Sequence, residues 1–325
     1  MKVSGINLWL YFLMVCFSCD TKKDYEGDFK KYFIKYYGED GTQEGIDLIA
    51  TQDTVWLLGT TRTDNNVSRI MLIQTDGEGN VRWEKKFGET RENARDIELT
   101  PAGDFLILSN MFLGQDIGTN EDLYKFKVLR VSRNGTKLDS VVFGNVWTTQ
   151  FAHAVTALSN GDFIVTGNTT DENFLTDTGL PPPDQEDLMA VVFNSDNSVR
   201  TTNVSTSAEY TGAVVKAFQK SSDQFYLFTY SDRLTSGGDT KYESNFNPFI
   251  LTNTGSLPTD AQAAGTGTRD EILKYVCRMP GGFYEIGTSS VLPQTVGMLY
   301  YTTRSDDLSL IDEGTVDAGD NLIAA

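Results

Sequence analysis

The sequence contains very little histidine, cysteine and proline. Of 325 residues, one is histidine, three are cysteine and eight are proline. A metal site built on several histidines is therefore excluded, and a Ser-His-Asp triad would have to use His153. The G-x-S-x-G, H-E-x-x-H and glycine-rich phosphate-binding motifs are also absent. We accordingly assign His153 a structural role at the start of a strand and name no catalytic residue.

Basic residues are scarce as well. The chain has 27 Lys and Arg against 45 Asp and Glu, which gives a formal charge of −18. Nucleic-acid binding needs clustered cations, so we expect no nucleic-acid partner. A basic surface that docks on anionic lipid is disfavoured for the same reason. Because 39% of the residues are hydrophobic, the chain can nevertheless form a core.

Long hydrophobic runs are missing except at the N-terminus. After Lys2 an apolar run covers residues 6–15, about half the length that a membrane-spanning helix needs. A short apolar run behind a positive charge is typical of a secretory signal peptide. Ser18-Cys19 resembles the lipobox of bacterial lipoproteins, although Cys16 and Phe17 depart from its usual pattern. The resemblance implies cleavage before Cys19 and lipidation of its sulfur.

These features predict three segments. Residues 1–18 are a lipoprotein signal peptide, residues 19–30 are a polar tether, and residues 31–325 are a repeat domain. We expect the lipid to hold the protein on a membrane of the cell envelope, as an outer-membrane lipoprotein of a Gram-negative bacterium. Cys277 is then the remaining thiol of the folded part. Because it lies in a strand-like alternation, we expect a buried small hydrophobe rather than a nucleophile.

A strand signal recurs five times in the repeat domain. It begins at Val55, Phe105, Phe163, Phe225 and Phe283. In each unit a turn-forming segment separates it from a preceding strand, and a third and a fourth strand follow. Four short antiparallel strands repeated about every 58 residues indicate the blades of an all-β β-propeller. A two-sheet sandwich is the alternative, but it would not need five copies in phase.

Both ends carry partial signals. Residues 32–39 look like another copy of the outer strand at residues 83–89, and residues 319–325 look like the start of a further first strand. These signals predict a ring of six or more blades, or an incomplete one.

Residues 79–88 and 101–108 carry a likeness to known proteins. Their Trp-Glu-Lys-Lys-Phe-Gly and Ala-Gly-Asp turn patterns resemble those of secreted bacterial propeller-repeat proteins. Many proteins of that group have lipoprotein signals and no assigned activity. The resemblance therefore implies a propeller fold and a location outside the cytoplasm, and it implies no catalytic activity.

Long acidic loops follow the second strand of several units, at residues 110–122, 171–187 and 230–247. Insertions at one position per repeat fall on one face of the ring, which is often the binding face. The candidate ligand-binding residues are Asp116, Asp171, Asp177, Asp184, Glu186, Asp187 and Asp239. Calcium is the one candidate cofactor, because carboxylates and carbonyls are its ligands. Asp76, Glu78 and Asn80 alternate as in a calcium loop, but we interpret them as a hairpin turn.

Two functions remain open. One is a lipid-anchored binding or scaffold module for a glycan, a peptide or an envelope protein. The other is a carboxylate-based glycoside hydrolase or lyase, which needs no histidine. The missing motifs favour the non-enzyme. Buried Asp and Glu converging on the central channel would favour the enzyme, whereas an apolar or plugged channel would favour the binding module.

Overall fold

The described part of the chain consists of strands and connections. The computed structural model describes residues 35–38, 41–63, 67–89, 91–115, 122–146, 148–170, 187–204, 210–233, 243–246, 248–252, 270–290 and 298–316. None of these residues belongs to a helix long and apolar enough to cross a bilayer. The strands are β1 (Thr42–Ala50), β2 (Thr54–Arg62), β3 (Ser68–Asp76), β4 (Val81–Phe87), β5 (Glu92–Leu99), β6 (Phe105–Gln115), β7 (Asp122–Val131), β8 (Lys137–Phe143), β9 (Gln150–Ala157), β10 (Phe163–Thr169), β11 (Asp187–Phe193), β12 (Val199–Val204), β13 (Tyr210–Gln219), β14 (Gln224–Arg233), β15 (Glu243–Phe246), β16 (Phe249–Thr252), β17 (Asp270–Met279), β18 (Gly282–Ser290), β19 (Met298–Ser305) and β20 (Leu310–Val316).

The strands form five antiparallel sheets in chain order. Blade 1 contains β1–β4, blade 2 β5–β8, blade 3 β9–β12, blade 4 β13–β16 and blade 5 β17–β20. The five predicted strand signals are the second strands β2, β6, β10, β14 and β18. The prediction of an all-β propeller of antiparallel blades is therefore confirmed, with five blades.

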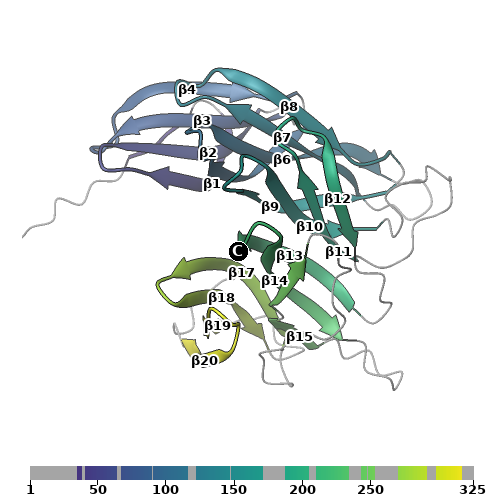
Figure 1. Ribbon diagram of the computed structural model, residues 1–325. Helices are drawn as coiled ribbons and strands as arrows, with labels where there is room; N and C mark the ends of the chain where they lie inside the picture. The colour runs from purple at the N-terminus through teal and green to yellow at the C-terminus, as the bar shows by residue number, and fades with distance from the viewer. Residues whose placement is uncertain are drawn as a thin grey trace, which may run out of the picture. The chain divides into compact units, whose positions relative to one another are not determined.

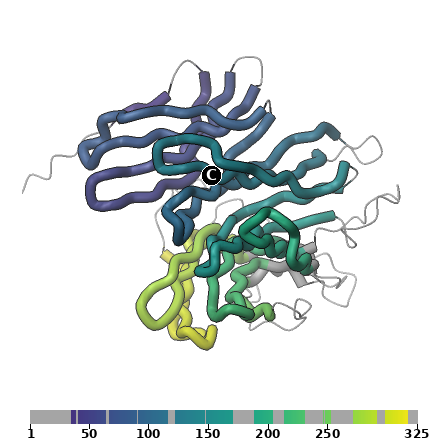
Figure 2. The backbone as a smooth tube through the Cα atoms, turned by 45° about the horizontal axis from the view of Figure 1, so that its top comes forward, coloured from purple at the N-terminus to yellow at the C-terminus, as the bar shows by residue number. Residues whose placement is uncertain are grey.

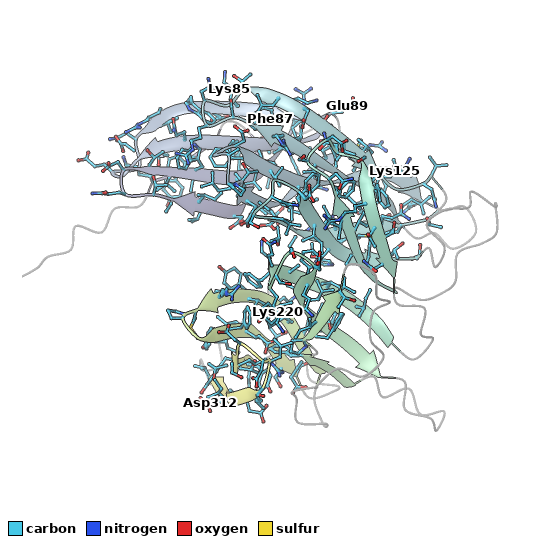
Figure 3. All side chains as sticks on the ribbon, in the orientation of Figure 1. Lys85, Phe87, Glu89, Lys125, Lys220 and Asp312 are labelled. Carbon is cyan, nitrogen blue, oxygen red and sulfur yellow. The ribbon has the colours of Figure 1, made fainter. Side chains whose placement is uncertain are left out.

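The first strand of each blade lies innermost and the last lies outermost. In Figure 1, β1, β9, β13 and β17 surround a common central region, while β4, β8, β12 and β20 lie outside it. The tube of Figure 2 shows the blades following one another in chain order, from purple in blade 1 to yellow in blade 5. Figure 3 shows Lys85 on β4 and Asp312 on β20 at the outer margins of blades 1 and 5.

Blade 4 departs from the regular pattern at its third strand. Both β15 and β16 pair with β14, β15 opposite its end and β16 opposite its start. Pro248 lies between them, and proline has no N–H to donate to the ladder. The third strand is therefore split into two segments. The fourth strand expected near residues 257–263 lies outside the described residues.

Four hydrophobic clusters hold consecutive blades together. Each cluster draws buried residues from two neighbouring blades: 1 and 2, 2 and 3, 3 and 4, or 4 and 5. Side chains that alternate along one strand enter different clusters. In β6, Phe105 and Ile107 pack toward blade 1, whereas Leu106 and Leu108 pack toward blade 3. A blade thus buries both faces only between two neighbours.

The predicted core residues are buried. Trp56 is 4% exposed, and Phe105, Phe163 and Phe225 are fully buried. Trp56 and Phe105 meet across the contact between blades 1 and 2, with ring centroids 5.2 Å apart. Each such side chain contributes about 1.5–3 kcal/mol of burial.

The expectation of six or more blades is not met by the described residues, which form five sheets. Residues 35–38 of the apparent outer-strand copy have no strand conformation, and Tyr36 is 93% exposed. A strand-like sequence forms a strand only where a neighbouring edge and a packing surface are present. The other partial signal, residues 319–325, lies outside the described residues. All five blades belong to the compact unit formed by residues 38–325.

Candidate functional site

A cavity lies where the innermost strands meet. Its volume is about 570 Å³, and its walls come from β1, β5, β9, β13 and β17, one strand from each blade. Small-molecule sites typically have volumes of about 300–1,000 Å³. This cavity is therefore the candidate site.

Each inner strand carries one extra residue at the same place. The pairing register shifts past this residue in every blade, which makes it a β-bulge. A bulge re-aims the local side chains, and all five extra residues line the cavity. In blade order they are Ile46, Arg95, His153, Val215 and Lys274.

The bulge accounts for glycines in the neighbouring second strands. A Cβ atom at Gly167 would lie 2.0 Å from the carbonyl oxygen of Phe151, and one at Gly287 would lie 2.1 Å from that of Ile272. No side chain fits at these distances. Blades 3 and 5 therefore have glycine beside the bulge, whereas Ser109 and Thr229 hold the equivalent positions in blades 2 and 4.

The residues that directly follow the bulge in the five inner strands form a ring in the cavity wall, and four of the five have polar side chains. Continuing past the bulge, blades 1 to 5 place Asp47, Asp96, Ala154, Lys216 and Tyr275 at equivalent register positions. Ala154 of blade 3 is the small member and leaves room between its polar neighbours. Tyr275 of blade 5 keeps 59% of its surface exposed.

Lys216 connects three blades through its ammonium group. Its Nζ donates to Oδ2 of Asp96 at 2.8 Å, to the carbonyl of Val155 at 3.2 Å and to Oε2 of Glu98 at 3.5 Å. Asp96 also accepts the backbone N–H groups of Val155 and Ile97, at 2.8 and 3.0 Å. Asp96 is therefore a fixed, fully bonded carboxylate. Glu98, at the edge of the network, keeps 34% of its side chain exposed.

The carboxyl group of Asp47 shares a hydrogen bond with that of Asp96. Burial and the neighbouring Asp96 raise the pKa of Asp47 to about 6. Burial raises the pKa of Glu98 as well, against the opposing effect of Lys216. Burial alone would lower the pKa of Lys216, but Asp96, Glu98 and Asp47 together raise it. The cavity thus holds an acid able to exchange a proton near neutral pH, beside a lysine that stays charged.

His153 and Cys277 also belong to the cavity wall. The His153 Nε2–H donates to Oδ1 of Asn168 on the adjacent strand, at 3.0 Å. Burial, with smaller effects of Arg95 and Lys274, lowers the pKa of His153 to about 4, so its imidazole is neutral at pH 7. Cys277 is only half-buried, so the expectation of a buried thiol is wrong. The reason is its strand, because β17 presents this part of its length to the cavity.

The predicted site residues lie outside what the structure describes. This holds for Cys19 and for the side chains of the acidic loops, namely Asp116, Asp171, Asp177, Asp184, Glu186, Asp187 and Asp239. Of this set only the backbone of Asp187 is described, at the start of β11. The loop sites therefore stay predictions.

Calcium has no described site. Among the side chains that the structure covers, no three His, Cys, Asp or Glu are grouped as metal ligands. Asp76 instead closes the turn after β3, where its Oδ1 accepts the backbone N–H groups of Glu78 and Asn80 at 2.9 and 2.8 Å. The hairpin-turn interpretation of this segment is confirmed.

Sequence reasoning missed the cavity residues, although a signal was present. Asp47 and Lys216 each follow apolar residues within the first strands of blades 1 and 4, directly after Ile46 and Val215. Charged residues within an innermost strand need a polar environment. Aligning the five first strands on the second-strand signals that follow them would have placed Asp47, Asp96 and Lys216 in one ring.

Comparison with known proteins gives structural likenesses only. No protein-family model matches the chain, and no curated protein matches it in sequence. An α-L-arabinofuranosidase from Clostridium thermocellum matches with a TM-score of 0.41 and 10% identity, over 85% of this chain and 94% of that one. An exo-1,5-α-L-arabinanase from a bovine ruminal metagenomic library matches with a TM-score of 0.42 and 9% identity, over 85% and 99%.

A Pyrococcus horikoshii acylaminoacyl peptidase matches with a TM-score of 0.36 and 9% identity. This chain spans about half the length of that peptidase, 52%. Glycosidases and a peptidase thus appear together, at a similarity from which no activity can be transferred.

Proposed function

We propose that this protein is a lipid-anchored, extracytoplasmic propeller that binds a short glycan in its central cavity. The observation that carries the proposal is the ring formed by Asp47, Asp96, Lys216 and Tyr275 around a cavity of about 570 Å³. Fixed donors and acceptors suit hydroxyl groups, which both donate and accept hydrogen bonds. The exposed ring of Tyr275 offers an apolar face with a polar tip.

The size of the cavity favours a glycan over the other expected partners. A stable protein partner needs about 800 Å² of surface on each side, usually on a broad patch. A concave site with a few convergent polar groups instead suits a small or narrow ligand. This proposal keeps the binding module expected from the sequence and moves its site from the acidic loops to the channel.

The binding proposal is tested on a glycan array with the full chain in detergent, followed by titration of the best glycan. Tyr275→Ala should weaken binding at least tenfold without changing the unfolding temperature by more than a few degrees. Tyr36→Ala removes an exposed tyrosine outside the blades and should leave binding unchanged. Equal affinities for the Tyr275 and Tyr36 variants would contradict a site in the cavity.

The lipid anchor is a separate part of the proposal and rests on the Ser18-Cys19 signal. Cys19→Ala should abolish incorporation of radiolabelled fatty acid and release the protein from membranes into the soluble fraction. Cys277→Ala is the matched control and should leave labelling unchanged. Undiminished labelling in the Cys19 variant would exclude a lipoprotein.

Glycoside hydrolysis is the second candidate, and one observation favours it. Asp47, Asp96 and Glu98 converge on a cavity whose described wall is partly polar, which is the arrangement expected of a carboxylate enzyme. Asp47, with a pKa near 6, would protonate the leaving oxygen, while Glu98 would accept a proton from the attacking water. Asp96 would hold Asp47 and Lys216 in place.

A measurement of reducing ends released from the bound glycan distinguishes hydrolysis from binding alone. Asp47→Asn and Glu98→Gln should each abolish turnover, and Asp47→Asn should still bind. Asp53→Asn changes an exposed turn and serves as the control. Binding by the wild type without any product release would leave the protein a binding module.

A further inference from the structure

Two of the five bulge residues are cations in the cavity wall, and neither forms an ion pair with a described carboxylate. Arg95 of blade 2 and Lys274 of blade 5 line the cavity, and both bear electrostatically on His153. Among the described residues, no carboxylate lies within ion-pair distance of either one. The carboxylate that acts electrostatically on Arg95 is Glu44, which forms its ion pair with Arg62 at 3.7 Å.

Several other described cations also lack an ion pair, so what distinguishes Arg95 and Lys274 is that both line the cavity. The other cavity lysine, Lys216, bonds two carboxylates, those of Asp96 and Glu98. Cations without an ion-pair partner at a concave site raise the local positive potential, which attracts and holds an anion.

Arg95 is moreover held in place for such a role. Its guanidinium carbon lies 4.5 Å from the centre of the Phe151 ring, and Phe151 packs edge-on against Tyr124. The Nε atom of Arg95 is buried and has no hydrogen-bond partner. A stacked guanidinium loses little freedom when it binds, and its planar fork matches the two oxygens of a carboxylate.

We infer that the ligand of the central cavity is an anionic saccharide, whose acidic substituent lies between Arg95 and Lys274. This inference rests on the proposed glycan binding and narrows its ligand to sugars that carry a carboxylate or a sulfate. The acidic ring of Asp47 and Asp96 then faces the uncharged hydroxyl groups. Lys216 offsets the charge of Asp96 and Glu98, so these carboxylates do not repel the anion at full strength.

The test is calorimetric titration of the full chain with glucuronate-containing, glucose-containing and sulfated disaccharides of matched linkage. We expect one of the two anionic sugars to bind at least tenfold more tightly than the neutral one, with an affinity that falls as salt rises. The sugar that binds best identifies the substituent as carboxylate or sulfate.

Substitutions of the two cations distinguish a loss of anion binding from a loss of folding. Arg95→Gln and Lys274→Gln should each lower the ratio of the affinities for the anionic and the neutral sugar at least tenfold. The affinity for the neutral sugar should stay within twofold of the wild-type value. Lys274 is exposed, so its variant should fold even if the Arg95 variant does not. Arg91→Gln is the matched control, because Arg91 lies over the Phe112 ring in the same blade and does not line the cavity.

The outcomes distinguish this inference from the proposed function. Equal binding of neutral and anionic sugars would overturn the anionic ligand and leave glycan binding intact. Absence of binding to any saccharide would overturn both.

Discussion

The ionisation of Asp47 depends on its burial and on one neighbouring carboxyl group. Its carboxyl group is partly removed from water and hydrogen-bonded to a second carboxyl group, Asp96, so its charged form is disfavoured. The sequence shows only an aspartate in a strand, and nothing local marks Asp96 as its partner 49 residues later. A pKa near 6 is a property of the ring of blades and could not be predicted from the strand alone.

The raised pKa of Asp47 makes a testable contribution to stability. Between the unfolded pKa near 4 and the folded pKa of about 6, the folded state holds more protons, so this contribution to stability falls as pH rises. The amide introduced by Asp47→Asn would mimic the protonated acid at every pH. Urea unfolding should therefore show the wild type losing roughly 1–2 kcal/mol relative to Asp47→Asn between pH 4 and 7, after allowance for partial exposure.

Glu98 has a pKa raised in the same direction, but it is present in both proteins and cancels in this comparison. Asp53→Asn, in an exposed turn, should run parallel to the wild type over the same range. Parallel curves for the wild type and Asp47→Asn would show that Asp47 ionises as an ordinary surface acid.

At the scale of elements, turns and alternating apolar residues allowed most strands to be predicted. The five second strands and their buried aromatic residues are confirmed, because local pattern and packing agree there. The strand expected from the pattern at residues 32–39 is absent at residues 35–38. The recurrent bulge was also unforeseen, since it is a relation between two strands rather than a pattern within one.

The bulge predicts a sharp difference between two glycines. Gly167→Ala should destabilise the protein by about 1–3 kcal/mol, because its Cβ would collide with the backbone oxygen of Phe151. Gly45→Ala, in the inner strand of blade 1, meets no atom within 4 Å and should change stability by less than about 0.5 kcal/mol. Denaturant midpoints measure both, and equal losses would mean that the close approach of the Phe151 oxygen does not exclude a side chain at position 167.

At the scale of the whole molecule, five blades each contribute one strand to one cavity. The candidate site is therefore assembled from residues about 50 to 60 positions apart, with no local motif to reveal it. Four clusters of buried side chains join blades 1 and 2, 2 and 3, 3 and 4, and 4 and 5, and so hold their inner strands next to one another. The central claim is that this cavity, rather than the acidic loops, binds the ligand.

Alkylation of Cys277 tests that claim most directly, because this half-buried thiol lies in the cavity wall. In the full chain with Cys16→Ser and Cys19→Ser, Cys277 is the sole target of N-ethylmaleimide. Saturation with the glycan that binds best should slow its alkylation at least fivefold under native conditions. An unchanged rate, with the glycan shown to be bound, would contradict the account and place the ligand elsewhere.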